Sequence, residues 1–454
     1  MSNVGEYLAE QTPGLGIAAY AAAVVAGDKV ELACGGEARA GSGQPVTPGT
    51  RFHICSCSKA FTALAFAALV KQGLTEWDAS AFAVVPEFEL ADPWISRQMT
   101  FRDLAGMRTG LGRDGIAEWG FRAEAPPAQR LSRARFMAFE APFRDRFSYS
   151  NLGYIALAVA AERISGLSFE ACLDQFVLRP LQLKSAGLGP GPNAAEPHMP
   201  IRGRMRPVPE LTGDSSRGSA RLYLCAEDAA RWIAAMLAAA IRARSGQEAL
   251  LGEAFSCQSV MRPRTGAALS AWGYGFGWSL CEYQGRQVFS HGGAGRGWRS
   301  IMVLDPDQRA GVMVMTAHEG AAAEGLALAL LELAAGRAPP PWMPPSAAGA
   351  AQPPLTPAAA LDDEPAGLYH GDLTGDVRIF RSPDGELRFA PEDAPAFDAR
   401  LERRQGNLFK FEFDSPAMTA MPGDPPFQLS FHQDPDAGAW AASTYFGRLR
   451  RVAP

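Results

Sequence analysis

FHICSCSKAFTALAFAALVKQG, residues 52–73, is the stretch that decides the fold. Residues 57–72 are typical of a helix, and Gly73 follows as a C-cap. The helix is apolar almost all round, which predicts that it lies buried inside the fold. Ser56 and Lys59 stand at its start, and residues three apart share one helix face. The stretch therefore predicts a buried helix that presents a serine and a lysine side by side.

Ser56 and Lys59 form an SxxK pattern that suits nucleophilic catalysis. A serine hydroxyl becomes a good nucleophile when a neighbouring base accepts its proton. Lysine can serve as that base when burial disfavours its ammonium form. Taken alone, the pattern is equally consistent with a helix-capping serine and a lysine that reaches solvent. Other segments must therefore decide between the two interpretations.

Two further polar segments favour the catalytic interpretation. Tyr149 and Asn151 stand at the head of a predicted helix. A tyrosine there can carry a proton between nucleophile and leaving group, and an asparagine can hold a substrate amide. His291-Gly292-Gly293 follows a predicted strand, and its glycines allow a substrate backbone to lie close against the strand edge. Three such segments in this order favour a catalytic site over chance occurrence.

Secondary-structure signals divide the rest of the catalytic region into three parts. Apolar runs at residues 14–25 and 29–34 flank a Gly-Asp turn and predict a hairpin. Helical patterns dominate residues 75–265, and strand patterns return after about residue 270 before a helix that ends at residue 336. Strands at both ends with helices between them predict an α+β fold. We expect an antiparallel sheet flanked by helices, with an all-helical insertion.

The C-terminal quarter of the chain has a different character. Residues 337–362 are rich in proline and alanine without a periodic pattern, which predicts a linker. From 363 to 454, short strand-like pieces alternate with turns and no helix pattern intervenes. The sequence thus predicts a catalytic domain over residues 1–336, a linker, and a small antiparallel β-barrel domain over residues 363–454.

The order of these segments resembles a known superfamily. SxxK, then YxN, then HxG before a terminal strand pair is similar to the class C β-lactamases, penicillin-binding proteins and related esterases. FHICSCSKAFTAL, FSYSNLGYIALA and SHGGAGRGWRS resemble the corresponding segments of bacterial D-aminopeptidases within that group. The resemblance covers about residues 10–335, and the β-rich tail resembles the lipocalin-like barrels that follow the catalytic domain in those enzymes.

The resemblance implies a role for each of these residues. Ser56 would be acylated, and Lys59 and Tyr149 would share the proton transfers. His291 would be the fourth catalytic residue, and Asn151 would bind the substrate amide. The remaining substrate-binding positions would be Gly292, Gly293 and Ala294. The resemblance also implies an oxyanion hole formed by the backbone N–H groups of Ser56 and Ala294.

Two departures from the superfamily pattern bear on the substrate. His291 stands where many penicillin-binding proteins have the lysine of KTG. A mostly neutral imidazole holds a free carboxylate less well than an ammonium does, which disfavours β-lactamase and carboxypeptidase activity. In addition, the D-aminopeptidases carry two barrels after the catalytic domain, whereas residues 363–454 suffice for one. Exo- and endo-cleavage, and the group that binds a substrate ammonium, are therefore left open.

Composition and charge exclude several function classes. A net charge of −5 gives no basic surface for nucleic acid or anionic membranes. The dispersed histidines and cysteines give no metal-ligand spacing, so we expect no metal and no cofactor. Seven irregularly spaced cysteines predict free thiols. Since the N-terminal residues lack a signal-peptide pattern, we expect a cytoplasmic protein.

The sequence predicts a serine hydrolase with a small peptide, amino-acid amide or ester as substrate. The first hypothesis is release of an N-terminal D-amino acid through an acyl-Ser56 intermediate. The second is a carboxylesterase of the same superfamily without D-preference. The third is a non-catalytic binding homologue, which the intact polar residues disfavour. Among partners, nucleic acid and membrane are not expected, and a homodimer is left open.

Overall fold

The chain was analysed as a computed structural model of all 454 residues. The description below covers residues 4–112, 126–201, 204–208, 210, 213–247, 250–263, 267–318, 322–340, 365–371, 375–392, 398–405, 408–414, 428–433, 440–444 and 447–453. Most of the predicted linker, from residue 341 onward, lies outside these residues.

An eight-stranded antiparallel sheet forms the centre of the first domain, with the strand order β2-β1-β13-β12-β11-β10-β9-β8. The predicted N-terminal hairpin is confirmed, and Gly27 takes a φ of 58° in its turn. The strands are β1 (Ala19–Ala26), β2 (Lys29–Gly36), β8 (Ser259–Val260), β9 (Ser270–Tyr274), β10 (Ser279–Tyr283), β11 (Arg286–Gly295), β12 (Trp298–Asp305) and β13 (Ala310–Thr316).

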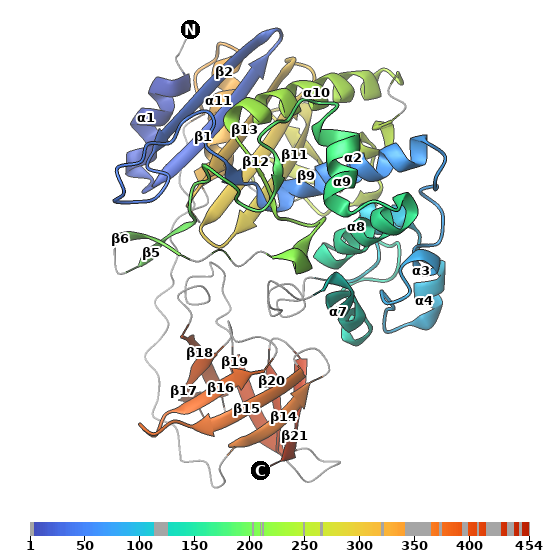
Figure 1. The fold of residues 1–454 in the computed structure, drawn as a ribbon, viewed down its shortest axis with the longest axis vertical. Helices are drawn as coiled ribbons and strands as arrows, with labels where there is room; N and C mark the ends of the chain where they lie inside the picture. Colours follow the sequence, from blue (N-terminus) through green and yellow to red (C-terminus); the bar gives the residue numbers. More distant parts are fainter. Residues whose placement is uncertain are drawn as a thin grey trace.

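Helices cover both faces of this sheet (Figure 1). On one face α10 (Ala226–Arg244) packs across β1 and β13, above the core that also receives α2 (Ser58–Lys71). On the other face α11 (Ala322–Ala334) packs on β12 and β13 beside α1 (Val4–Gly14). Strands β12 and β13 are therefore buried on both sides, which explains their continuous apolar sequence.

Helix α2 lies inside the domain, as its apolar sequence predicts. Every residue from Ser58 to Ala67 is buried. A short 3-10 helix, η1 (Cys55–Cys57), leads into it, and Gly73 takes the left-handed φ of 71° just beyond its end. The turn between β9 and β10 approaches its first turn closely, because a Cβ on Gly277 would lie 2.5 Å from Ala60 Cα. The first turn of α2 is thus closely packed against the turn between β9 and β10.

The insertion between α2 and β8 is mainly helical. Thr100 and Asp103 form a capping box at the start of α5. The helices are α3 (Ala81–Val84), α4 (Pro93–Gln98), α5 (Phe101–Ala105), α7 (Pro127–Leu131), η2 (Ser132–Phe136), α8 (Asn151–Ser165), α9 (Phe169–Leu173), η3 (Asp174–Leu178), η4 (Asp214–Ser216), α10 and η5 (Gly252–Phe255).

The insertion differs from the expected all-helical one by four short strands. Strand β7 pairs with β3 and β4, and β5 pairs with β6 in a separate hairpin. These strands are two to four residues long, too short to give a period-2 pattern in the sequence. Their bounds are β4 (Gly187–Leu188), β5 (His198–Ile201), β6 (Arg204–Pro207) and β7 (Leu222–Leu224), and β3 (Phe52–His53), which pairs with β7, precedes α2.

The C-terminal strands close into an eight-stranded antiparallel barrel, which confirms the predicted barrel. It closes where β21 pairs with β14. Aromatic side chains fill the interior, among them the edge-to-face pairs Phe389–Phe411 and Phe409–Phe431. The strands are β14 (Gly367–Gly371), β15 (Gly375–Arg381), β16 (Leu387–Pro391), β17 (Ala399–Gln405), β18 (Leu408–Phe413), β19 (Gln428–Gln433), β20 (Trp440–Thr444) and β21 (Gly447–Ala453).

None of the described helices is by itself long and apolar enough to cross a membrane. One pair of helices, Asn151–Ser165 and Phe169–Leu178, meets the criteria of length and composition only when taken together, and the pair is bent by 84°.

Candidate active site

The nucleophile candidate Ser56 lies in η1, at the entrance to α2. It is half-buried, whereas Cys55 and Cys57 on either side of it are buried. Cys55 has a φ of 48°, a left-handed conformation that is rare outside glycine and turns the chain sharply before the serine. The Ser58 hydroxyl donates to Cys55 O (2.6 Å), and Ile54 N donates to Leu222 O (3.0 Å). This turn is therefore fixed from two sides.

Lys59 lies fully buried beneath Ser56. Its Nζ is 3.2 Å from Ser56 Oγ, 2.6 Å from Asn151 Oδ1 and 2.8 Å from Ser219 O. The Ser219 segment is in turn held by Thr62, one turn along α2, whose hydroxyl donates to Gly218 O (2.7 Å). The amino group is thus aimed at the serine by acceptors on two other parts of the chain.

Tyr149 and Asn151 reach the same centre from the N-terminus of α8. The hydroxyl of Tyr149 donates to Ser56 Oγ at 2.9 Å, and Lys59 Nζ lies 5.0 Å from the centroid of the tyrosine ring. Asn151 is the first residue of α8, and its amide oxygen accepts the lysine bond. Ser56, Lys59, Tyr149 and Asn151 therefore form one hydrogen-bonded group.

Strand β11 brings the third predicted segment against η1. A Cβ on Gly293 would lie 2.4 Å from Ile54 O and 2.2 Å from Ser300 Oγ, so only glycine allows this approach. Gly292 and Ala294 are exposed on the other face of the strand. Within the described residues, β10 pairs with β11 only as far as Ser290. The edge beyond it is where an extended substrate backbone could add to the sheet.

His291 belongs to a second hydrogen-bonded group next to the first. Its Nδ1 lies 2.8 Å from Gly292 O and its Nε2 lies 3.1 Å from the hydroxyl of Tyr274. The thiol of Cys57, the neighbour of the serine, donates to the backbone oxygen of His291 (3.1 Å). The structure thus brings all three predicted segments to one place.

The sequence interpretation missed two residues of this site. Ser219 contributes only a backbone oxygen, a group that every residue carries, so the sequence holds no signal for it. Tyr274 begins the YGFGW stretch, residues 274–278, and its hydroxyl lies 3.1 Å from His291 Nε2. A tyrosine shortly before the HGG segment was therefore the available signal.

The two cysteines next to Ser56 are not competing nucleophiles. Burial raises the pKa of Cys57 to about 12, and burial raises the pKa of Cys55 well above that of a free thiol. A protonated thiol is a poor nucleophile. All seven cysteines are free, as predicted, and these two fill space in the core.

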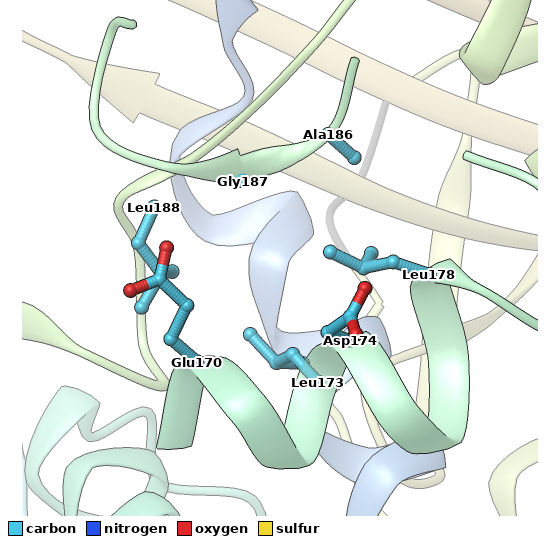
Figure 2. A pocket seen from close by; sticks show the side chains of 7 residues that line it. All are labelled: Glu170, Leu173, Asp174, Leu178, Ala186, Gly187 and Leu188. Atoms are coloured by element: carbon cyan, nitrogen blue, oxygen red, sulfur yellow. The ribbon is translucent and has the colours of Figure 1, made fainter. Parts of the chain in front are cut away.

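Other candidate sites in the described part of the chain are few. No group of three or more His, Cys, Asp or Glu side chains there has the arrangement of a metal site. A cavity of about 210 Å³ lies between α9, η3 and β4 (Figure 2). Its lining contains none of the predicted site residues and consists of Glu170, Leu173, Asp174, Leu178, Ala186, Gly187 and Leu188.

Comparison with known proteins agrees with the arrangement of this site. Residues 4–337 match the Beta-lactamase family model. Penicillin-binding protein 4 of Amycolatopsis lactamdurans is 26% identical over 74% of this chain and 89% of its own length. The D-aminopeptidase of Brucella canis is 28% identical over 65% of this chain, and unguisins hydrolase ungD' of Aspergillus campestris is 26% identical over 58%. The chain spans about half the length of these last two relatives, 55% and 51%.

Solved structures show the same fold at low sequence identity. The octameric penicillin-binding protein homologue from Pyrococcus abyssi is 19% identical, with a TM-score of 0.65 over 98% of both chains. The D-amino acid amidase from Ochrobactrum anthropi SV3 is 20% identical, with a TM-score of 0.57 over 69% of this chain and 90% of its own. The family match, the fold and the Ser56 centre lead to one conclusion: the chain belongs to the Beta-lactamase family.

Proposed function

We propose that this protein hydrolyses the amide bond that follows an N-terminal D-amino acid, in small peptides or amino-acid amides, through an acyl-Ser56 intermediate. The observation that carries the proposal is the position of Ser56 Oγ, 3.2 Å from Lys59 Nζ and 2.9 Å from the hydroxyl of Tyr149. Two proton-transfer groups therefore contact one partly exposed serine hydroxyl, which is the arrangement that nucleophilic catalysis needs.

In the proposed reaction, Ser56 Oγ attacks the carbonyl carbon and its proton passes to the Lys59–Tyr149 pair. The carbonyl oxygen becomes an oxyanion, held by the backbone N–H groups of Ser56 and Ala294. Each such donor contributes about 3 kcal/mol to transition-state stabilisation. The C–N bond then breaks as Tyr149 returns the proton to the leaving amine. Water attacks the ester, which releases the D-amino acid and restores the Ser56 hydroxyl.

The choice of an amide substrate follows from the groups around the serine. Asn151 is suited to bind a substrate amide, and His291 takes the place of a lysine that would hold a free carboxylate. The D-preference is supported by the names of the Brucella D-aminopeptidase and the Ochrobactrum D-amino acid amidase. Paired D- and L-substrates therefore test the stereochemistry directly.

The test is an assay of the purified protein with D-alanine and L-alanine p-nitroanilides and with p-nitrophenyl butyrate. We expect turnover of the D-anilide in preference to the L-anilide. Ser56→Ala should lower kcat/KM by at least about 10⁴-fold, since the nucleophile is lost. Ser42→Ala, which changes an exposed serine, is the matched control and should keep wild-type activity.

The other outcomes distinguish the alternatives. Hydrolysis of the butyrate ester with neither anilide turned over would favour the carboxylesterase without D-preference. Turnover of both anilides at equal rates would remove the D-preference while leaving the amidase. Full activity in Ser56→Ala would overturn the assignment of the nucleophile itself.

A further inference from the structure

The ring of His291 has a defined protonation pattern. Its Nδ1 lies 2.8 Å from Gly292 O, and a carbonyl oxygen only accepts hydrogen bonds. Nδ1 therefore carries a hydrogen. In a neutral imidazole the other nitrogen, Nε2, then has a free lone pair and acts as an acceptor.

The hydroxyl of Tyr274 is the group that faces this nitrogen. It lies 3.1 Å from His291 Nε2, and the side chain of Tyr274 is only 1% exposed at the end of β9. Burial raises the pKa of Tyr274 well above that of a free tyrosine, so the hydroxyl keeps its proton. The side chain of His291 is 5% exposed, and both of its ring nitrogens have a hydrogen-bond partner. One partner is the backbone carbonyl of Gly292 and the other is the hydroxyl of Tyr274.

Tyr274 also packs toward the nucleophile's own hydrogen-bonded group. The ring of Phe147 lies 5.1 Å from the ring of Tyr274 and 6.3 Å from the ring of Tyr149, measured between centroids. Tyr149 bonds to Ser56. A row of three aromatic rings therefore connects the residue that bonds His291 with the residue that bonds the serine.

We propose that Tyr274 is a positioning residue: its hydroxyl donates to His291 Nε2 and so holds the imidazole in the Nδ1–H tautomer. In this tautomer Nε2 is an acceptor and cannot donate a hydrogen bond as a lysine ammonium would. The same bond fixes the angle of the ring beside the substrate edge of β11. This inference rests on the proposed function, in which His291 lies beside the substrate. It deepens that function by assigning a neutral imidazole to the position, which suits amides and esters rather than substrates with a free carboxylate there.

The first test reads the tautomer directly. The wild-type protein, labelled with ¹⁵N-histidine, is compared by NMR with Tyr274→Phe, and His291→Gln identifies the His291 signals. We expect the wild type to show a protonated Nδ1 and an unprotonated Nε2, and Tyr274→Phe to add the other tautomer. Tyr283→Phe is the matched control, since it removes the hydroxyl of another buried tyrosine, on β10. A wild-type His291 protonated at Nε2 instead of Nδ1 would overturn the proposal without any variant.

The second test reads the effect on catalysis. With D-alanine p-nitroanilide, Tyr274→Phe should lower kcat about tenfold, because a misplaced site group costs rate, while KM stays within about twofold. Tyr283→Phe should keep wild-type values. Unchanged kcat, or a lowered kcat with the His291 signals unaltered, would each overturn the positioning role. If the wild type turns over no amide, the proposed function fails separately, and the rate of Ser56 labelling by a fluorophosphonate replaces kcat.

Discussion

At the scale of single residues, the amino group of Lys59 has three defined contacts, with Ser56 Oγ, Asn151 Oδ1 and Ser219 O. Asn151 Oδ1 and Ser219 O can only accept, so they take two of its hydrogens. The remaining position of the tetrahedral nitrogen faces Ser56 Oγ at 3.2 Å. A neutral amine would place its lone pair there, ready to accept the serine proton. The contacts thus orient the lysine for the role of base.

Replacing Lys59 tests this interpretation. We expect Lys59→Met to lower kcat/KM by about 10³-fold on whichever substrate the wild type turns over, since the base is lost and Met fills a similar volume. Thermal unfolding should show that the variant remains folded. Activity within tenfold of the wild type would mean that Tyr149 alone serves as the base.

At the scale of elements, the contact between β11 and η1 positions the nucleophile relative to the substrate edge. Gly293 lies directly against Ile54 O, and Ser300 on the neighbouring strand β12 donates to the same oxygen at 2.6 Å. The turn before Ser56 is thus bonded to the sheet, although the two are more than 200 residues apart in sequence. Because Gly293 has no side chain, β11 can lie close enough to η1 to hold Ser56 in place.

Gly293→Ala is expected to destabilise the fold by about 2 kcal/mol, because a methyl group there overlaps backbone and must push η1 away from β11. Urea unfolding at neutral pH measures the change. Gly292→Ala is the matched control: its nearest neighbour, Ser300 O, would lie 4.0 Å away, and stability should change by less than about 0.5 kcal/mol. Equal stability of the two variants would contradict the close approach.

At the scale of the whole molecule, buried histidines couple stability to pH. Burial lowers the pKa of His318 to about 4, and burial also lowers the pKa of His53 and of His198. An unfolded chain would bind a proton on each of them below about pH 6.5. Their contribution to stability is therefore complete above pH 6.5 and is lost as the pH falls toward 4.

For His318 alone, this loss amounts to at most about 3 kcal/mol between pH 6.5 and 4. We expect His318→Gln to flatten the decline of the unfolding free energy over this range, since the variant takes up no proton at this position. Urea titrations at several pH values, referenced to pH 8 for each protein, give the comparison. Parallel curves for the variant and the wild type would contradict a lowered pKa of His318 in the folded state.

Much of the architecture could be predicted because its elements have strong local patterns. Helix α2, helix α10, the N-terminal hairpin and strands β11 to β13 lie where apolar periodicity indicates. The sequence of strand β17, ARLERRQ, is too polar to indicate a strand, and its partners in the barrel decide its conformation. The domain boundaries, the cytoplasmic location and the homodimer stay predictions.

The sequence by itself determined which chemistry-bearing residues this protein has, their order, and the helix and strand on which Ser56, Lys59 and His291 stand. Those properties depend on local spacing. Only the tertiary structure decided that Ser219 O holds Lys59 and that Tyr274 bonds His291. Such contacts join different secondary-structure elements, and one of them uses a backbone oxygen that no side chain marks. Close packing of the core, which local patterns do not encode, sets these distances.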